Sequence, residues 1–349
     1  MTPVELSRTV LRAVRRAVDE GELSVTVPGR AVVTPPGPGG CGDYATNIAL
    51  QLARPAGQPP LRVAEILRSR LADADGVTGV VVTGPGFLNI SLRSESSAAL
   101  VEEILRRGQR YGYADGPSGQ VVQLHAPHEV RAVVVMDVVA RLLRSQGALV
   151  RTSCEARPEP AWVDVLGVRV DAYGRPGAPA PLDVNVRPVP AAPADPVPLG
   201  RDATRWALLR PALHDHARLT DDHLVQRESN PLFRVRYAYA RTRALSRNAA
   251  DLGFTPDPGA LPEEAPLLTA LADHPRALAQ AATHRTPDRL ARHVVTVADA
   301  VVPLLPSVLP RGDEKPSAAH RARLALAEAA GAVLAGGLFL LGIDAPQHL

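Results

Sequence analysis

The sequence predicts a multidomain α+β protein, in which an α+β domain comes first, a short α/β segment follows, and an all-α helical bundle completes the chain. Three observations support this fold class. Helical and alternating patterns succeed one another in the first third, β-like runs surround one helix in the middle, and helical periodicity continues from residue 201 onward. The length of 349 residues and the hydrophobic content of 46% allow more than one core. We therefore place the domains at 1–117, 118–199 and 200–349.

The charge balance permits an anionic partner but does not by itself attract nucleic acid. The formal net charge is +3 and the isoelectric point is about 9.1, so any RNA contact has to come from local patches. Nearly all of the positive charge is arginine, because Lys315 is the only lysine. Cys41 and Cys154 lack a CxxC partner and a histidine at ligand spacing, which favours free thiols in a reducing cytoplasm over a disulfide or a zinc site.

The first block alternates helix and strand signals. Thr2, Pro3 and Glu5 form the start signal of a helix whose apolar residues repeat at helical spacing, so the N-terminus is predicted to be an amphipathic helix and not a signal peptide. A glycine-rich loop then precedes a helix that Asp43 is expected to cap, and its exposed N–H groups are a candidate phosphate contact. The predicted helices cover 3–20, 43–53, 61–72 and 94–108, and the predicted strands cover 77–82 and 87–92.

The middle and last blocks differ in periodicity. The middle block contains one predicted helix, 130–145, and β-like runs over 121–124, 148–152, 162–170 and 182–186. Its end, 174–200, is rich in Pro, Ala and Gly and is expected to be a linker or a loop-rich tail. The helical block is interrupted at Pro211, Asn230–Pro231, 255–262 and 303–316. Its apolar run from Ala329 to Ile343 is shorter than a membrane span, so a buried helix is expected.

The segment from Gly42 to Leu92 carries a longer match. GDYATNIALQLARPAGQPP, followed by VAEILRSRL and GVTGVVVTGPGFLNI, resembles in order and spacing the N-terminal additional domain of the class I arginyl-tRNA synthetases. In that family the domain grips the elbow of the tRNA at the D-loop, so the resemblance implies that Phe87 stacks on an unstacked nucleotide and Asn89 bonds its base edge. The same segment makes candidates of Asp43, Tyr44 and Asn47. Alternatively, Phe87 is a core residue and Asn89 a solvated strand residue.

A second match covers the helical block from Gly200 to Pro346. GRDATRWALL, LTDDHLVQRESNPLFRVRYAYARTRAL, LARHVVTVADAV and RARLALAEAAGAVLAGGLFLLGIDAP resemble, in family order, the DALR-type anticodon-binding domain of the same family. The resemblance implies contact with the anticodon region by Asn230, Tyr237, Tyr239 and Arg241. Helical spacing places Arg236, Arg243 and Arg247 on one face, which fits a phosphate backbone or, alternatively, a solvated face. The identity of the bound tRNA is left open by departures from the family pattern at Phe233, Arg234, Arg236 and Leu349.

The middle block resembles only the first part of a class I catalytic domain. VVQL and the helix RAVVVMDVVARLL are similar to the strand and helix around the family's HIGH signature, which implies a vestigial, Rossmann-like α/β domain. His125 and His128 keep the spacing of the signature histidines in the turn HAPHE, but Pro127 replaces the glycine that lets ATP approach the backbone. No KMSK equivalent exists, because the only lysine lies in the helical block. We interpret His125 and His128 as vestigial and predict no catalytic residue.

The leading hypothesis is a non-catalytic, cytoplasmic protein, similar to arginyl-tRNA synthetases, that binds tRNA, arginine tRNA included, at the elbow and the anticodon region. Two alternatives stay open: a residual arginine-tRNA ligase that uses ATP, and a protein-interaction module that partners a full-length synthetase. No cofactor is expected unless the ligase alternative holds, and no membrane or DNA partner is expected. No metal is expected either, since ordered ligand spacing is absent from the cluster His214, Asp215, His216, Asp221, Asp222 and His223.

Overall fold

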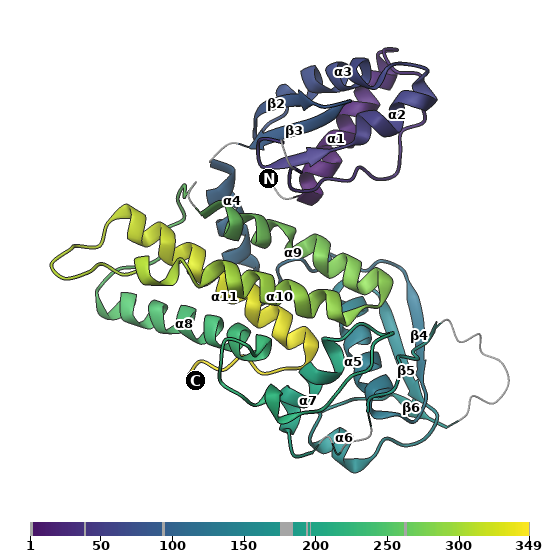
Figure 1. Cartoon of the computed structure of the whole chain (residues 1–349), viewed down its shortest axis with the longest axis vertical. Coiled ribbons are helices and arrows are strands. Elements are labelled where there is room, and N and C mark those ends of the chain that lie inside the picture. The colour runs from purple at the N-terminus through teal and green to yellow at the C-terminus, as the bar shows by residue number, and fades with distance from the viewer. Residues whose placement is uncertain are drawn as a thin grey trace. The chain divides into compact units, whose positions relative to one another are not determined.

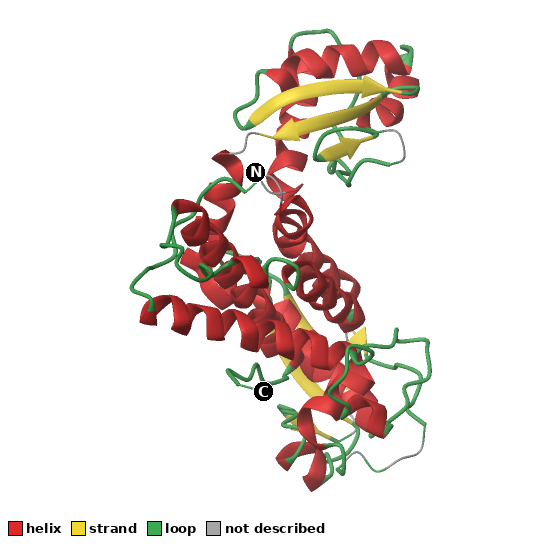
Figure 2. Cartoon of the chain, turned by 60° about the vertical axis from the view of Figure 1, so that its left-hand side comes forward, coloured by secondary structure: helices red, strands yellow, loops and turns green. Residues whose placement is uncertain are grey.

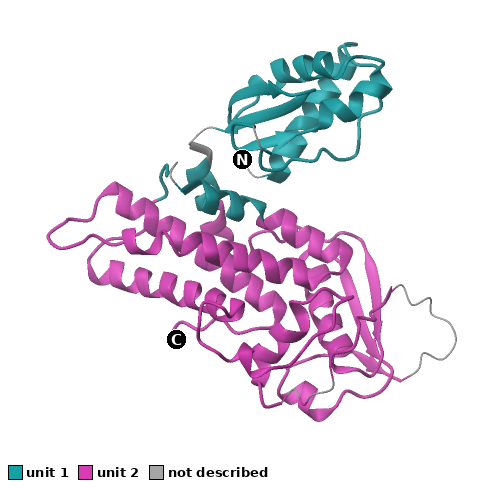
Figure 3. Cartoon of the chain, in the orientation of Figure 1, with its two compact units in different colours: residues 1–102, 258–273 teal, residues 103–257, 274–349 magenta. Residues whose placement is uncertain are grey.

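The chain forms two compact units (Figure 3). The computed structural model describes residues 3–37, 40–92, 95–174, 184–192, 195, 197–261 and 264–348. Unit 1 consists of residues 1–102 and 258–273, and unit 2 consists of residues 103–257 and 274–349. The division into three domains stays a prediction, and the predicted capping role of Thr2 lies outside the described residues.

Unit 1 contains a three-stranded antiparallel sheet in the order β1-β3-β2 (Figures 1 and 2). Its elements are α1 (Pro3–Asp19), β1 (Tyr44–Thr46), α2 (Ile48–Ala56), α3 (Pro60–Ala72), β2 (Val77–Thr83) and β3 (Phe87–Leu92). Helices α2 and α3 pack against the sheet, and α1 packs against α3. Leu88 and Ile90 of the central strand are completely buried in this core, because alternate residues of a strand point to the same face.

The helix predicted over 43–53 begins later than expected. Residues 44–46 form strand β1, which pairs with β3, and the helix starts only at Ile48. Asp43 does not cap this helix, since its carboxylate accepts a hydrogen bond from the Leu92 backbone N–H at 2.7 Å. The central strand offers an unpaired edge to this segment, and the tertiary pairing overrides the local helix signal.

The first part of unit 2 holds a four-stranded parallel sheet in the order β6-β5-β4-β7. Its elements are α4 (Glu95–Arg107), which begins in unit 1, η1 (Gly108–Arg110), β4 (Val121–Ala126), α5 (Val130–Ser145), β5 (Leu149–Cys154), α6 (Pro160–Asp164), β6 (Ala172–Tyr173) and β7 (Val184–Asn185). In chain order the strands run 3-2-1-4, as in the first half of a doubly wound fold. The prediction of a short, Rossmann-like α/β segment is thus confirmed.

The predicted strand over 162–170 is wrong. The segment begins with the short helix α6 and continues without strand structure, although Leu166 and Val168 are buried. Pro160 occupies the first helical turn, where its fixed φ favours a helix. A short apolar run is compatible with a strand or with a buried irregular segment, and periodicity alone does not separate the two.

The remainder of unit 2 is helical. Its elements are α7 (Gly200–Leu209), η2 (Asp221–His223), α8 (Pro231–Asp251), α9 (Ala265–His284), which begins in unit 1, α10 (Pro287–Val301), η4 (Leu305–Ser307) and α11 (Ala318–Leu341). Helices α8, α10 and α11 pack against one another, and glycines of α11 permit the close approach. A Cβ at Gly337 would lie 2.3 Å from Val294 Cγ1, and one at Gly331 would lie 2.6 Å from Thr242 Oγ1. The multidomain α+β class with a C-terminal helical domain is confirmed.

Two helical segments, 287–307 and 318–341, are long and apolar enough to span a membrane by length and composition. Of their most apolar windows, 50% and 83% respectively are buried inside the protein. Core helices of globular proteins pass the same test, so these segments are weak indicators of a membrane span. For the run from Ala329 to Ile343, the prediction of a buried helix is confirmed, although Phe339 is exposed.

Candidate nucleic-acid interface

The outer face of the unit 1 sheet exposes two apolar side chains beside each other. Phe87 is 40% exposed and Val81 is 49% exposed, and both lie on the same face as Asn89, which is the direct cross-strand partner of Val81. Phe87 follows the turn at Gly86, where φ is +135° and a Cβ would lie 3.1 Å from the Pro60 carbonyl oxygen. A half-exposed aromatic ring next to an open apolar surface can stack on a base.

Asn89 belongs to this face, but its side chain is covered. The residue is 2% exposed, and its Nδ2 donates to Thr83 Oγ1 at 2.7 Å and to the Val81 carbonyl oxygen at 3.3 Å. Its Oδ1 accepts from the Cys41 backbone N–H at 3.4 Å. The amide thus fastens the glycine-rich loop to the sheet, and the base contact implied for Asn89 by the resemblance stays a prediction.

The other three candidates of unit 1 surround strand β1. Asp43 is exposed but already accepts from Leu92, and Asn47 is half-buried with its Oδ1 accepting from Gln51 Nε2 at 3.0 Å. Tyr44 is 4% exposed and belongs to the hydrophobic core. Asp43 and Asn47 therefore present polar atoms near the surface, whereas Tyr44 supports the sheet from inside.

Four candidates at the start of α8 separate into buried and exposed pairs. Asn230 caps the helix, because its Oδ1 accepts from the Leu232 N–H at 3.0 Å, and its Nδ2 donates to the carbonyl oxygens of His223 and Val225. Tyr239 is 8% exposed, whereas Tyr237 is 39% exposed and Arg241 is exposed as well. The ring of Tyr237 lies 5.8 Å from that of Phe233, measured between centroids. The two rings together form an aromatic surface on α8.

The arginines Arg236, Arg243 and Arg247 do share a face of α8, and the chain itself covers part of it. Arg236 Nη2 lies 3.7 Å from Asp202 Oδ2, and Arg247 Nη2 donates to the Gln347 carbonyl oxygen at 3.4 Å. Arg243 lines a hollow of about 350 Å³ together with Gln347. Each of the three residues is only half-buried, so part of this face stays open to solvent.

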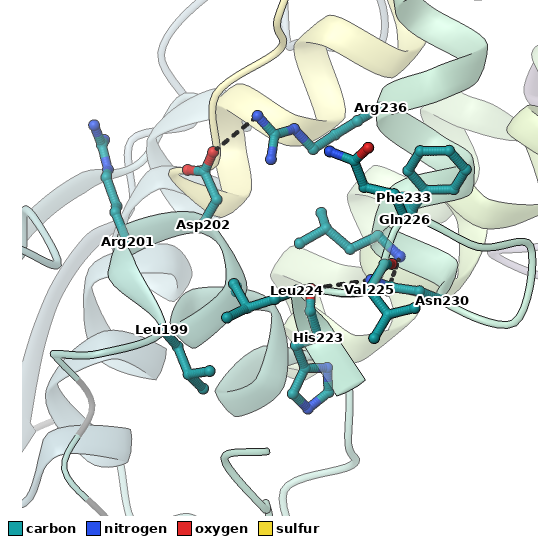
Figure 4. Close-up of a pocket in the computed structure, with 12 residues that line it drawn as sticks. Leu199, Arg201, Asp202, His223, Leu224, Val225, Gln226, Asn230, Phe233 and Arg236 are labelled. Carbon is teal, nitrogen blue, oxygen red and sulfur yellow. Dashed lines mark hydrogen bonds and ion pairs between the residues drawn. The ribbon is translucent and has the colours of Figure 1, made fainter. Parts of the chain in front are cut away.

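A cavity of about 370 Å³ lies between α7, the η2 segment and the start of α8 (Figure 4). Its polar lining consists of Arg201, Asp202, His223, Gln226, Asn230 and Arg236, and Phe233 supplies an aromatic ring. Burial raises the pKa of Asp202, and the nearby guanidinium of Arg236 counteracts this shift. The mixture of a carboxylate, amide groups, guanidinium donors and a ring can hold a flat polar group such as a nucleobase. Sequence reasoning singled out Asn230, Phe233 and Arg236 of this lining, and His223 only as part of a polar cluster. It missed Arg201, Asp202 and Gln226, because folding alone brings α7 to α8.

Of the two histidines interpreted as vestigial, His125 lies in strand β4 and His128 lies in the turn between β4 and α5. His125 is 6% exposed, and its Nδ1 lies 2.9 Å from Ser153 Oγ. His128 Nε2 donates to the Arg157 carbonyl oxygen at 3.0 Å, and its ring lies 4.9 Å from that of Trp162. Both rings therefore have intramolecular partners.

The N-terminus of α5 is occupied by a carboxylate of the chain. Glu129 Oε1 accepts from the Arg131 N–H at 2.9 Å, and Oε2 accepts from the Ala132 N–H at 2.8 Å. These are the backbone groups with which a helix start can bind an anion. No clear sequence signal predicts this cap, because glutamate is not among the preferred N-cap residues.

Arg131, at the start of α5, connects this helix to neighbouring segments of the chain. Its side chain is completely buried, and burial lowers the pKa of its guanidinium. The guanidinium donates to five backbone carbonyl oxygens at 2.6 to 3.2 Å, those of Val189, Leu208, Pro211, Ala212 and Asp215. These contacts hold the segments after β7 and α7 against the start of α5. In the sequence, Arg131 directly precedes the apolar run 132–136, and this position is the only local hint of a buried arginine.

Family models match both ends of the chain. The arginyl tRNA synthetase N terminal domain matches residues 5–92, and the DALR anticodon binding domain matches residues 235–349. An arginine–tRNA ligase of Renibacterium salmoninarum is 40% identical over 195 residues, which are 52% of this chain and 35% of that protein. One of Frankia alni is 35% identical over 184 residues, covering 50% of this chain and 32% of that protein. These matches span about a third of the relatives' length.

Full-length comparisons show that this chain is shorter than a relative that it matches from end to end. An arginine–tRNA ligase of Kineococcus radiotolerans is 25% identical over an alignment of 554 positions that covers 100% of both chains. Because this chain has 349 residues, more than a third of those positions have no counterpart in it. Among solved structures, the arginyl-tRNA synthetase of Thermus thermophilus aligns with a TM-score of 0.71, 16% identity and 100% coverage of both chains. That of Plasmodium falciparum aligns with a TM-score of 0.69, 9% identity and 99% coverage of both. At such identities the two structures support the fold alone.

Proposed function

Because the chain belongs to the arginyl-tRNA synthetase family, we propose that it is a non-catalytic member that binds tRNA through both ends. The N-terminal region binds the tRNA elbow, and the C-terminal helices bind the anticodon region. The observation that carries the non-catalytic part is the occupation of the α5 N-terminus by Glu129. The same proposal places the protein in the cytoplasm, where its free thiols Cys41 and Cys154 stay reduced.

The region where ATP would bind does not fit a phosphate group. In open, mostly parallel sheets, ligands bind outside the carboxyl ends of the strands, at the point where the strand order reverses. Here that point lies between β4 and β7, next to the turn at Pro127 and Glu129. The Glu129 carboxylate would repel a phosphate, and Pro127 has no N–H to donate. The residues present therefore argue against ATP binding at this edge.

The cationic residues of the chain support the same interpretation. Arg131 is already bound to five carbonyl oxygens and has no donor left for a phosphate. Lys315 is exposed in the segment before α11, and it does not follow a strand of the parallel sheet. A class I ligase needs cationic groups that stabilise the transferring phosphates, and this chain offers no equivalent set among the residues discussed.

The RNA-binding part of the proposal depends on accessible aromatic and cationic groups in each unit. In unit 1, Phe87 stacks on a base above the face that Asn89 supports. In unit 2, Tyr237 and Arg241 are exposed on α8, and the cavity beside Phe233 receives an unstacked base. These groups match how proteins recognise single-stranded loops, by stacking and by bonding to base edges.

Two measurements on the purified full chain test the proposal. Fluorescence anisotropy with labelled tRNA at low salt is expected to show binding, because phosphate contacts are strongest there. ATP–pyrophosphate exchange in the presence of arginine is expected to be absent. Failure to bind any tRNA would contradict the proposal, and arginine-dependent exchange would support a residual ligase instead. Capture of a full-length synthetase without tRNA binding would favour a protein-interaction module.

The identity of the RNA needs a separate experiment. We expect RNA crosslinked to the protein in cells, and then sequenced, to be enriched in tRNA. Enrichment of arginine tRNA alone would mean that Phe233, Arg234 and Arg236 preserve the family's specificity despite their departure from its pattern. Enrichment of several tRNAs would mean that the C-terminal region has become less selective.

A further inference from the structure

Helix α1 presents four arginines on its solvent side. Arg8, Arg12, Arg15 and Arg16 are all exposed, whereas Leu6, Val10 and Val14 on the opposite side are completely buried in the core of unit 1. At 3.6 residues per turn, Arg8, Arg12 and Arg15 fall within one narrow sector of the helix, and Arg16 lies beside them. We call these four residues the arginine stripe, which extends over about 12 Å of helix axis.

The guanidinium groups of the arginine stripe lack a direct carboxylate partner within the described part of unit 1. No ion pair is recorded there for any of its four members, and its one side-chain hydrogen bond runs from Arg12 Nη2 to Thr9 Oγ1 at 2.9 Å. On the neighbouring helix α3, by contrast, Arg68 pairs with Glu65 and Arg70 pairs with Glu22. Like charges one helical turn apart repel each other. A polyanion that lies along α1 would relieve this repulsion.

We propose that the arginine stripe is an additional RNA-binding surface that contacts the phosphate backbone. This inference rests on the tRNA binding proposed above and adds a surface that lies outside Phe87 and β1. Guanidinium groups match the geometry of phosphate oxygens, and α1 contains no aromatic residue with which to stack on a base. The contact therefore helps to position the RNA and does not depend on the nucleotide sequence of the RNA.

The path of the RNA follows the outer surface of α1. A hollow of about 340 Å³ between α1 and the end of α3 is lined by Arg12, Arg16 and Arg70, but also by Asp73 and Asp75. Those carboxylates disfavour a phosphate inside the hollow. The exposed row from Arg8 to Arg15 has no carboxylate within it, since the acidic residues of α1 are Glu5 and Asp19 near its two ends.

The test compares two quadruple variants of the full chain that lose the same charge. The first is R8Q/R12Q/R15Q/R16Q. The control is R151Q/R157Q/R169Q/R187Q, whose arginines are exposed in unit 2 and have no recorded ion pair within the described residues. Affinity for tRNA is measured by anisotropy between about 50 and 200 mM salt. We expect the first variant to lose affinity at least about tenfold and its salt dependence, the slope of log affinity against log salt, to fall by about 3.

The control variant is expected to change both quantities much less. Equal changes in the two variants would overturn the inference while leaving tRNA binding intact, and no binding by the unmodified protein would overturn the proposed function itself. The variant R8K/R12K/R15K/R16K keeps the charge and should keep the salt slope. A slope as low as that of the glutamine variant would also overturn the inference.

A footprint on the unmodified protein covers the case in which the glutamine variant does not fold. Phenylglyoxal modifies exposed arginines, and peptide mass spectrometry then shows which of them tRNA protects. Protection of Arg8, Arg12 and Arg15, but not of Arg151 and Arg157, is the expected result, and equal labelling with and without tRNA contradicts it. Vesicles of acidic phospholipid provide the last comparison, because loss of vesicle binding with unchanged tRNA affinity would assign the arginine stripe to a membrane surface instead.

Discussion

Phe87 and Asn89 lie on the same face of β3 but differ in exposure, and this difference predicts different consequences of substitution. Phe87→Ala should lower tRNA affinity about 5- to 150-fold, as expected for one lost stacking contact of about 1–3 kcal/mol, with little change in stability. Asn89→Ala should destabilise unit 1 by about 1–3 kcal/mol, because Thr83, Val81 and Cys41 lose a buried partner. Anisotropy and urea unfolding of both variants check this. An Asn89→Ala protein of normal stability but weak binding would instead support a base contact.

The imidazole of His274 should make unit 2 sensitive to acid. It is 1% exposed, and its ring centroid lies 5.9 Å from that of Tyr111 and 5.2 Å from that of His293. Burial, together with the charge of His293, holds the pKa of His274 well below its ordinary value. In the unfolded chain this histidine takes up a proton below about pH 6.5. Its neutral burial therefore costs nothing above that pH, and stability decreases as the pH falls below it.

The matched variants are His274→Phe and His214→Phe, the second at a side chain that is 85% exposed. Urea midpoints are compared between about pH 7.5 and pH 5, on either side of the unfolded histidine pKa. Replacing His274 should flatten the acid side of the stability profile, whereas replacing His214 should leave its shape unchanged. Identical profiles for the two variants would show that another group causes the acid sensitivity.

Helix α5 shows both the success and the limit of prediction from sequence at the level of an element. The bounds 130–145 agree with the structure, because a long apolar pattern ends at Gly147 and follows a turn containing Pro127. Its cap escaped prediction, since glutamate rarely caps through its own side chain. Glu129→Ala should destabilise unit 2 by about 0.5–2 kcal/mol in urea unfolding, against a smaller effect for Glu155→Ala at an exposed position. ATP–pyrophosphate exchange should stay absent in Glu129→Ala. Exchange by this variant would mean that the Glu129 carboxylate alone prevents ATP from binding productively.

Elements with weak local signals were predicted less well. The strand of residues 44–46 forms because the edge of β3 needs a partner, and the apolar run over 162–170 packs without entering a ladder. The candidate site behaves similarly. The exposure of Phe87 and Tyr237 agrees with an RNA-contacting role. Residue spacing cannot reveal, however, that the side-chain amide of Asn89 already forms hydrogen bonds within unit 1. The residues that line the α7–α8 cavity are distant in sequence, so no local sequence pattern predicts that they lie together.

At the scale of the whole molecule, buried charged side chains connect the parallel sheet of unit 2, through α5, to its helices. Arg205 of α7 is completely buried, and it donates to Asp137 Oδ2 at 2.6 Å and to the carbonyl oxygens of Leu166 and Leu341 at 2.8 Å. These bonds connect α7 to α5, to the end of α11 and to the segment after α6. We infer that unit 2 unfolds as one cooperative body.

Arg205→Met tests this coupling, because it leaves the Asp137 carboxylate buried without its main partner. The cost should be about 3–5 kcal/mol, and it should lower the stability of sheet and helices together. Arg141→Met is the control, since Arg141 binds the same carboxylate at 3.2 Å from a more exposed position and should cost about 1 kcal/mol or less. Both tryptophans, Trp162 and Trp206, lie in unit 2, so urea unfolding followed by fluorescence reports on that unit.

The double variant Arg205→Met/Asp137→Leu removes both charges and should recover much of the lost stability, because an apolar pair of similar volume does not carry the desolvation cost of the ions. A single midpoint from Trp162 and Trp206, measured in variants that each retain one tryptophan, is expected if sheet and helices unfold as one body. Two separate midpoints would mean that the sheet is an independent subdomain. In that case Arg205 would position α7 without coupling the two parts energetically.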